Sequence, residues 1–359
     1  PISNIVPTTM FVLLSLYTCF ALSLSTSITL PNGSPIVGKQ DGAVLTYLGI
    51  PYAEQPTGPN RWKHVGLAGP WNYTHDGTKA GPGCPQVCTL PPHNCPNSMA
   101  EACLVANVFV PADATATAAL PVGAFIHGGH FTQGSIDTVL YSAVPWLTAH
   151  PSMVIVTFQY RMGALGFLSS ASLDGTFGFT DQQVALQWIQ ANVGVFGGDP
   201  SKVTLFGESA GASSIGAHLI APNSAGLFRA AIMESNPWTL PFKTASANEG
   251  ISEDFAKGIG CDVSDMACLQ AADINKIVTA SNDAEKHFDV IHPLRAFMPW
   301  TPVVGGAAIP QQPRDAMIAG AGANVPIMVG HVSNETVLFI YEAFSEPLST
   351  VKYDAFLAD

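Results

Sequence analysis

The chain has 359 residues, enough for one large α/β domain or two smaller ones, and a chain of this length can bury a core without metals or cross-links. Its 14 Lys and Arg against 26 Asp and Glu give a formal net charge of −12, which argues against a nucleic-acid partner. With 47% hydrophobic and 11% charged residues, disorder over most of the chain is excluded, and we find no repeat typical of a solenoid or propeller.

The first residues carry a targeting pattern. Met10 precedes an uncharged apolar run at 11–24 that ends in small residues, and the first charged side chain is Lys39. Such a run is too short to span a bilayer comfortably and is typical of a secretory signal peptide. We therefore expect a signal peptide at 10–27, upstream residues at 1–9, and a secreted protein without a stable membrane anchor. A membrane anchor and a buried segment are the alternatives for this run.

The cysteines support an oxidising compartment. Of the seven, Cys19 falls within the expected signal peptide, and the others form two clusters, Cys84, Cys88, Cys95, Cys103 and Cys261, Cys268. An even number in local clusters indicates a disulfide framework, with a zinc site as the alternative for the first cluster. Sequons at Asn32, Asn72 and Asn334 are compatible with glycosylation, and we expect no metal and no cofactor.

Strand-like and helix-like segments alternate from residue 120 onward. Apolar, largely β-branched runs predict buried strands, at 120–126, 153–159, 202–206, 230–233 and 325–329. Helical spacing predicts helices over 181–193 and from Ala210 to Ile220. This alternation indicates a parallel sheet covered by helices on both faces, and without a flexible linker after residue 30 we expect one large α/β domain.

The pentapeptide Gly207-Glu208-Ser209-Ala210-Gly211 joins a predicted strand directly to a predicted helix. In that setting G-x-S-x-G forms a sharp turn that presents the serine hydroxyl at the carboxyl edge of the sheet. The N–H of Ala210 then lies at the helix N-terminus, where it can donate to an oxyanion. The bare pattern is frequent by chance, so its position between strand and helix carries the hypothesis.

A second motif, HGGHF at 127–131, follows the predicted strand at 120–126. A glycine-rich loop after an early strand supplies further oxyanion donors in hydrolases that use such a serine turn. The alternative is a glycine-rich turn with two incidental histidines. Both motifs together, in this order, predict a serine hydrolase.

Beyond these motifs, the sequence from about residue 28 to its end resembles the type-B carboxylesterases, the family that includes cholinesterases and some fungal lipases. The stretches that carry the resemblance are GIPYAEQPTGPNRW at 49–62, EACLVANVFVP at 101–111, HGGHF at 127–131, YRMGALGFLS at 160–169, DQQVALQWIQANVGVFGGDPSKVTLFGESAG at 181–211 and LFRAAIMES at 227–235. The resemblance implies an α/β-hydrolase fold over 28–359, with a large, mostly parallel central sheet covered by helices on both faces.

The resemblance also implies roles for single residues. Ser209 is the expected nucleophile, and Glu208 is expected to help position the site. VPIMVGHVSNET at 325–336 matches the stretch that carries the acid of the triad, which gives Glu335. The alternative for Glu335 is an acidic residue favoured in the first turn of a helix.

For the oxyanion hole, the resemblance implies the backbone N–H groups of Gly129, His130 and Ala210. His130 stands where the family has a glycine, so its side chain is expected to narrow or polarise the pocket. For the scaffold, it implies disulfides Cys84–Cys103 and Cys261–Cys268 with an extra nested bridge Cys88–Cys95, and a structural ion pair between Arg61 and Glu101.

The loop between Cys84 and Cys103 bears on the substrate. In related lipases it forms a lid, and in cholinesterases it carries a Trp that stacks on a quaternary ammonium. Here it is short, rich in proline and free of aromatic residues, which favours small to medium acyl esters over lipids or choline esters. Trp238, Phe242 and Trp300 are candidates for an acyl pocket, with a place in the core as the alternative.

The expected reaction is acyl transfer through an acyl-enzyme, which needs a histidine base. In this fold the order is Ser, acid, His, yet all ten histidines precede Glu335. We therefore expect an incomplete chain that stops before the loop with the triad histidine and is inactive by itself. The alternatives are a non-catalytic cholinesterase-like binding or adhesion protein and a truncated inactive product.

Overall fold

The computed structural model describes residues 26–89, 94–286 and 298–335, together with 347, 349–351 and 354. The expected signal peptide at 10–27 lies outside the described residues except for its last two positions. Among the helices that the structure describes, none is both long and apolar enough to cross a membrane.

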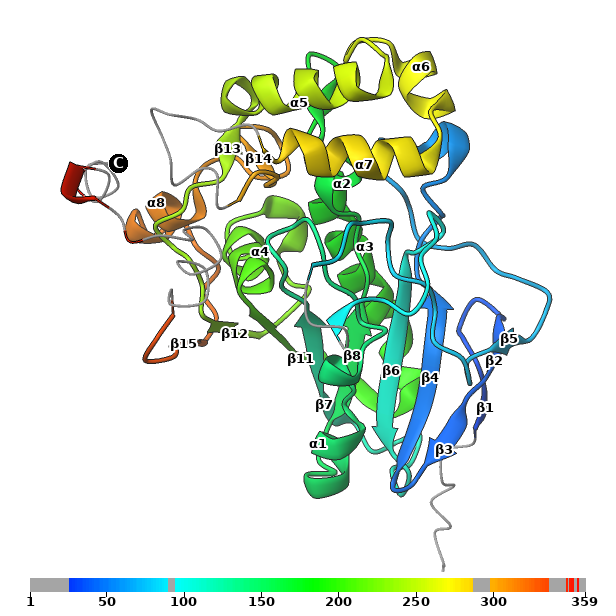
Figure 1. Cartoon of the computed structure of the whole chain (residues 1–359). Helices are drawn as coiled ribbons and strands as arrows, with labels where there is room; N and C mark the ends of the chain where they lie inside the picture. The colour runs from blue at the N-terminus through cyan, green and yellow to red at the C-terminus, as the bar shows by residue number, and fades with distance from the viewer. Residues whose placement is uncertain are drawn as a thin grey trace, which may run out of the picture.

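The described residues contain an eight-stranded sheet in the order β15-β12-β11-β7-β8-β6-β4-β3 (Figure 1). Its strands are β3 Lys39–Asp41, β4 Val44–Pro51, β6 Val105–Pro111, β7 Leu120–Ile126, β8 Val154–Phe158, β11 Gly198–Glu208, β12 Ala230–Glu234 and β15 Ile327–Gly330. The strands from β15 to β8 are parallel, and β6, β4 and β3 each pair antiparallel with the strand before them in this order. Because the carboxyl ends of parallel strands meet at one edge, the loops after β7, β11, β12 and β15 share that edge.

Helices cover both faces of this sheet. Val44 and Leu45 are neighbours on β4 and therefore point to opposite faces. Val44 belongs to a small core cluster with Leu147 of α1 Val144–Ala149. Leu45 belongs to the large core cluster, which also contains buried residues of α3 Phe177–Asn192 and α4 Ala210–His218.

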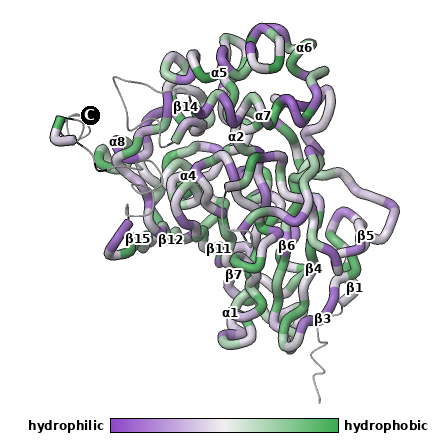
Figure 2. The backbone as a smooth tube through the Cα atoms, viewed as in Figure 1, coloured by the Kyte–Doolittle hydropathy of each residue, from purple (hydrophilic) through white to green (hydrophobic). Residues whose placement is uncertain are grey.

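The remaining elements surround this sheet. Short strands form small separate sheets: β1 Ser27–Thr29, β2 Pro35–Val37, β5 His75–Asp76, β9 Ser169–Ser170, β10 Leu173–Asp174, β13 Lys243–Thr244 and β14 Val303–Val304. The other helices are α2 Gly163–Phe167, α5 Ala245–Ile259, α6 Met266–Ala271, α7 Ile274–Ala284 and α8 Pro313–Ile318, with 3-10 turns at Gly58–Asn60, Val139–Tyr141, Val193–Phe196 and Pro222–Ser224. Figure 1 shows α5, α6 and α7 as a layer beyond α2, which follows the carboxyl end of β8. In Figure 2, α5 and α7 alternate between hydrophilic and hydrophobic residues, as expected for helices with one buried face.

The predicted strands are all present, but the prediction of a buried strand at 325–329 is wrong in one respect. All four residues of β15 are exposed, because β15 lies at the outer end of the described sheet and pairs only with β12. The helix predicted over 181–193 begins earlier, at Phe177, after a turn in which Asp174 accepts from the Thr176 N–H. The exposure of β15 depends on strand order and has no local signal, whereas the turn before α3 has one in Asp174 and Gly175.

Candidate active site

Ser209 lies on a sharp turn between β11 and α4. Its backbone angles are φ 55° and ψ −119°, a region that non-glycine residues occupy only when the surrounding structure holds them there. Its N–H donates to the carbonyl of Glu234 over 3.0 Å, and its carbonyl accepts from the N–H of Ser213 over 2.9 Å. The turn is therefore attached to β12 on one side and to the first turn of α4 on the other.

The two motif glycines let this turn pack directly on the end of β7. A Cβ on Gly211 would lie 2.0 Å from the carbonyl oxygen of Ile126, and a Cβ on Gly207 would lie 2.6 Å from the same atom. No side chain fits at either position without moving backbone. Since Ile126 immediately precedes the HGGHF loop, this contact brings the two sequence motifs together.

The glycine-rich loop contacts the serine turn itself. A Cβ on Gly128 would lie 3.2 Å from the Cβ of Ser209 and 2.7 Å from Oε2 of Glu208. Gly129 and His130 follow with positive φ values of 110° and 57°. The structure therefore places the loop that contains the Gly129 and His130 N–H groups beside Ser209.

Ala210 completes the predicted set of backbone donors. It is the first residue of α4, where an N–H group has no acceptor within the helix. The carbonyl of Gly129 accepts the N–H groups of Thr132 and Gln133 over 3.1 and 3.0 Å, which closes the glycine loop into a tight turn. Backbone N–H groups of a folded loop and of a helix N-terminus thus lie at the same edge of the sheet.

The buried ring of His127 packs against the glycine-rich loop. Its ring is fully buried and stacks on Tyr160 with centroids 4.4 Å apart, and Nδ1 lies 2.9 Å from the carbonyl oxygen of Gly128. Burial lowers the pKa of His127 to about 4, so the ring is neutral at physiological pH. The hydroxyl of Tyr160 donates to the carbonyl of His127 over 2.9 Å. Nδ1–H therefore donates to Gly128, which gives His127 a structural place beneath the loop.

Glu335 lies at the same carboxyl edge, shortly after β15. Its Oε1 accepts from the Ser235 hydroxyl over 2.8 Å and from the Val332 N–H over 2.7 Å. Ser235 directly follows β12, has φ 51° and donates its N–H to the carbonyl of Gly330 over 2.8 Å. Sequence reasoning missed Ser235, although its place just after a predicted strand is a signal that it shares with the other residues of this edge.

Glu208 lies beside the glycine-rich loop and within electrostatic reach of two further carboxylates. The residue is exposed, but Oε2 lies against Gly128. The carboxyl group is nevertheless partly shielded from water by its neighbours. This partial desolvation, followed by the negative charges of Glu234 and Glu335, raises the pKa of Glu208 above its ordinary value. Glu208 is therefore close enough to Glu335 for their charges to interact.

Several described histidines have hydrogen-bond partners outside this site. His218 is buried between Ser224 and Gln182, at 2.8 and 3.1 Å, and burial lowers its pKa to about 3. His64 lies between Thr180 and Asp174, at 2.8 and 2.9 Å. His93, His287 and His292 lie outside the described residues.

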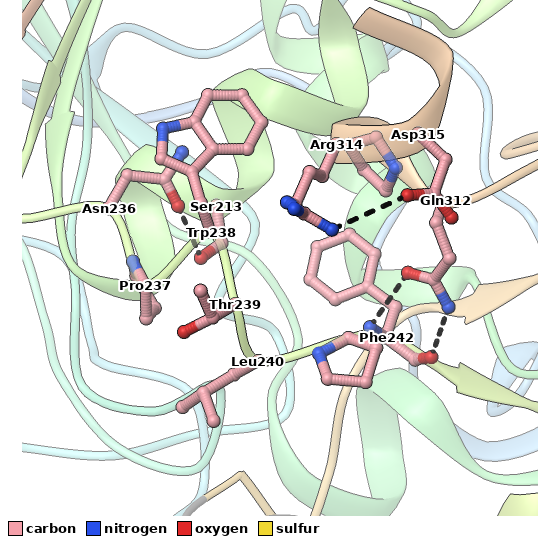
Figure 3. A pocket seen from close by; sticks show the side chains of 12 residues that line it. Ser213, Asn236, Pro237, Trp238, Thr239, Leu240, Phe242, Gln312, Arg314 and Asp315 are labelled. Carbon is pink, nitrogen blue, oxygen red and sulfur yellow. Dashed lines mark hydrogen bonds and ion pairs between the residues drawn. The ribbon is translucent and has the colours of Figure 1, made fainter. Parts of the chain in front are cut away.

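A cavity of about 230 Å³ opens next to α4 (Figure 3). It is lined by residues of α4, of the segment after β12 and of α8, namely Ser213, Asn236, Pro237, Trp238, Thr239, Leu240, Pro241, Phe242, Gln312, Pro313, Arg314 and Asp315. Of the three aromatic candidates for an acyl pocket, Trp238 and Phe242 line this cavity, whereas Trp300 is fully buried in the core. Ser209 is not among the lining residues, but Ser213 lies one helical turn beyond it.

Comparison with known proteins assigns the chain to a protein family. A model of the carboxylesterase family matches residues 25–358. The chain belongs to the carboxylesterase family. Among curated relatives, the cAMP-regulated D2 protein of Dictyostelium discoideum is 35% identical over 334 residues, which cover 92% of the chain and 62% of the relative. Cocaine esterase of Oryctolagus cuniculus is 35% identical over 309 residues, which cover 82% of the chain and 55% of that enzyme.

Solved carboxylesterases share the architecture. A PNB esterase superposes with a TM-score of 0.80 at 32% identity, over 92% of this chain and 68% of that chain. This match confirms the predicted α/β-hydrolase fold with a large mixed, mostly parallel central sheet. The chain spans less than two thirds of the length of both curated relatives named above, 62% of the D2 protein and 55% of cocaine esterase.

The scaffold features implied by the family resemblance are also present in the structure. The disulfides are Cys84–Cys103, Cys88–Cys95 and Cys261–Cys268. Nη2 of Arg61 lies 2.7 Å from Oε2 of Glu101, and the same guanidinium donates to the carbonyls of Gln270 and Ala272. This arginine therefore joins the first disulfide loop to α6. Among the described residues, no group of three or more His, Cys, Asp or Glu side chains is arranged to hold a metal ion.

Proposed function

We propose that this chain belongs to a secreted serine hydrolase that cleaves small to medium carboxylic esters through an acyl-enzyme. The observation that carries the proposal is the strained backbone of Ser209, held at the carboxyl edge of the sheet with Gly128 packed against it. Strain of this kind is typical of functional sites, and presentation of a nucleophile explains it here.

In the proposed reaction, Oγ of Ser209 attacks the ester carbonyl. The N–H groups of Gly129, His130 and Ala210 bind the oxyanion, the alcohol leaves, and water then releases the acid from Ser209. Glu335 orients the histidine that accepts and returns the proton. Glu208 helps to position the site.

The histidine itself is assigned by chain order. In α/β-hydrolases the base follows the acid, and the printed sequence has no histidine after Glu335. We therefore assign the base to none of the ten histidines of the printed sequence, and we expect residues 1–359 alone to turn over little substrate.

The substrate class is supported by the first disulfide loop and by the cavity. The loop between Cys84 and Cys103 is short, is cross-linked again by Cys88–Cys95 and carries no Trp. A loop of this kind is a poor lid and offers no ring for a quaternary ammonium. The cavity of about 230 Å³ beside Trp238 and Phe242 suits a short acyl chain. Secretion is supported by the disulfides, because such bonds persist in oxidising compartments.

The test is hydrolysis of 4-nitrophenyl butyrate by the full-length protein. We expect Ser209→Ala to reduce kcat by at least about 10⁴-fold, because the remaining oxyanion and binding contributions supply only part of the rate. Ser201→Ala is the matched control, because Ser201 is exposed near the start of β11, and this variant should retain activity. Activity that survives in Ser209→Ala would reject this nucleophile, and a wild-type protein without turnover would favour a non-catalytic binding protein.

A further inference from the structure

Gln86 joins the first disulfide loop to the segment that follows the glycine-rich loop. Its side chain is buried, with 6% exposed. Oε1 accepts from the N–H of Gly134 over 2.7 Å, and Nε2 donates to the carbonyls of Gly134 and Cys84 over 2.9 and 3.0 Å. One amide therefore satisfies both the N–H and the carbonyl of Gly134, as a neighbouring strand would.

Gly134 in turn packs against the glycine-rich loop. Its φ is 120°, and a Cβ there would lie 2.6 Å from the carbonyl oxygen of Gly128 and 2.6 Å from Nδ1 of His127. The Gly134 backbone and the His127 ring thus enclose the Gly128 carbonyl. In a trans peptide the carbonyl of Gly128 and the N–H of Gly129 point in opposite directions. Whatever orients that carbonyl therefore also orients the Gly129 N–H.

We propose that Gln86 is a positioning residue for the oxyanion hole, acting through Gly134 and the Gly128–Gly129 peptide. The inference rests on the proposed function, because it concerns a donor of that reaction. An oxyanion donor acts only when it is aimed at the developing charge, and a displacement of about 1 Å can cost about 10²-fold in rate. Loss of the Gln86 amide should therefore affect the transition state more than substrate binding.

The chain contains a matched control for this glutamine. Gln55 also donates to the carbonyl two residues before it, that of Ala53, over 2.9 Å. It also pairs with both polar groups of one distant residue, donating to the Leu104 carbonyl over 3.3 Å and accepting from the Leu104 N–H over 3.1 Å. Gln55 thus has the same set of bonds as Gln86, but its partner Leu104 precedes β6 and is not in the glycine-rich loop.

The first test compares Gln86→Met with Gln55→Met in the full-length protein. For Gln86→Met we expect kcat on 4-nitrophenyl butyrate to fall about 10- to 100-fold, with KM changed by less than about 3-fold. Inhibition by an alkyl trifluoromethyl ketone, which forms a tetrahedral adduct with the serine, should weaken by a similar factor. Gln55→Met should keep kcat within about 2-fold of wild type. Equal kcat losses in both variants, or none in Gln86→Met, would overturn the proposal.

A second variant separates the hydrogen bonds from the shape of the side chain. In Gln86→Glu the new carboxyl resembles the amide only when it is protonated, because it then has both a donor and an acceptor. Burial raises the pKa of such a carboxyl. The kcat of Gln86→Glu relative to wild type should therefore rise as the pH is lowered. A ratio independent of pH would contradict a role of the donor.

Hydrogen exchange tests the inference without any turnover. In Gln86→Met, the amides of residues 128–134 should exchange faster than in wild type, whereas Gln55→Met should leave them unchanged. If wild type shows no Ser209-dependent turnover but this difference is seen, the proposed function fails and the positioning contact remains. Unchanged exchange in Gln86→Met would reject the positioning role even in an active enzyme.

Discussion

At the scale of single residues, the site combines a strained backbone with neighbouring carboxylates of like charge. Ser209 keeps a strained backbone because β12 and α4 bind its two peptide groups. Glu208 keeps a carboxylate beside two others, Glu234 and Glu335, and against Gly128. Such arrangements lower stability and are typical of sites where charge serves a reaction.

The charge at Glu208 leads to a pH-dependent prediction. Its pKa is raised from 4.5 in the folded protein, so its contribution to stability is complete below 4.5 and is lost as the pH rises through the raised pKa. Glu208→Gln removes this titration. We expect the variant to melt about 1 °C above wild type at pH 7, a small effect because the residue is solvent-exposed, and to match wild type at pH 4. Thermal melts across this range check the sign, and a difference of melting temperatures that does not vary with pH would contradict it.

At the scale of elements, one buried ion pair anchors α3 to the segment that follows β8. Nη2 of Arg161, which follows β8, lies 2.6 Å from Oδ1 of Asp181 on α3, with side-chain exposures of 3% and 0%. Oδ2 of Asp181 also accepts from the N–H of Arg161 over 3.1 Å. The pair thus attaches α3 to the loop at the carboxyl edge, next to the elements of the site.

Breaking this pair from one side should be costly. Asp181→Asn leaves the Arg161 guanidinium buried without its counter-charge, and we expect the free energy of unfolding to fall by about 3 kcal/mol. The exposed pair of Glu253 and Lys257 on α5, at 3.2 Å, provides the control. Glu253→Gln should cost less than about 0.5 kcal/mol. Urea unfolding of both variants measures the difference, and similar values for the two would refute the argument from burial.

At the scale of the whole molecule, the described sheet ends on an apolar strand. Ile327, Met328 and Val329 of β15 are 37%, 65% and 57% exposed, and β12 is the only strand that β15 pairs with in the described part of the chain. An exposed apolar edge strand is a template for pairing with another chain. The net charge of −12 opposes association only weakly at physiological salt, because charges are screened within about 8 Å.

We therefore expect residues 1–359, prepared alone, to associate through β15. Met328→Lys places a charge on this strand and should shift the chain toward monomer in sedimentation velocity. Ile318→Lys, at a residue of α8 that is 73% exposed, is the control and should leave the association unchanged. Equal effects of both substitutions would show that association depends on net charge and not on the sheet edge.

The features that the sequence predicted correctly are those with a local physical cause. The apolar run at 120–126 is β7, because a strand buried on both faces needs apolar residues throughout. The turn at Ser209 was predictable because only glycines allow so close an approach to β7 at Gly207 and Gly211. Glu335 is predicted as the acid of the triad by the family resemblance alone, and this assignment stays a prediction.

By itself, then, the sequence determined the class of fold, the serine turn and the glycine-rich loop. Only the tertiary structure decided which distant groups meet: Ser235 with Glu335, 100 residues apart, and Gln86 with Gly134, 48 residues apart. It also decided that β15 is exposed, against the expectation of a buried strand. Local spacing and turn chemistry specify an element, but strand order and the packing of loops at one sheet edge determine its partners, and these depend on the whole chain.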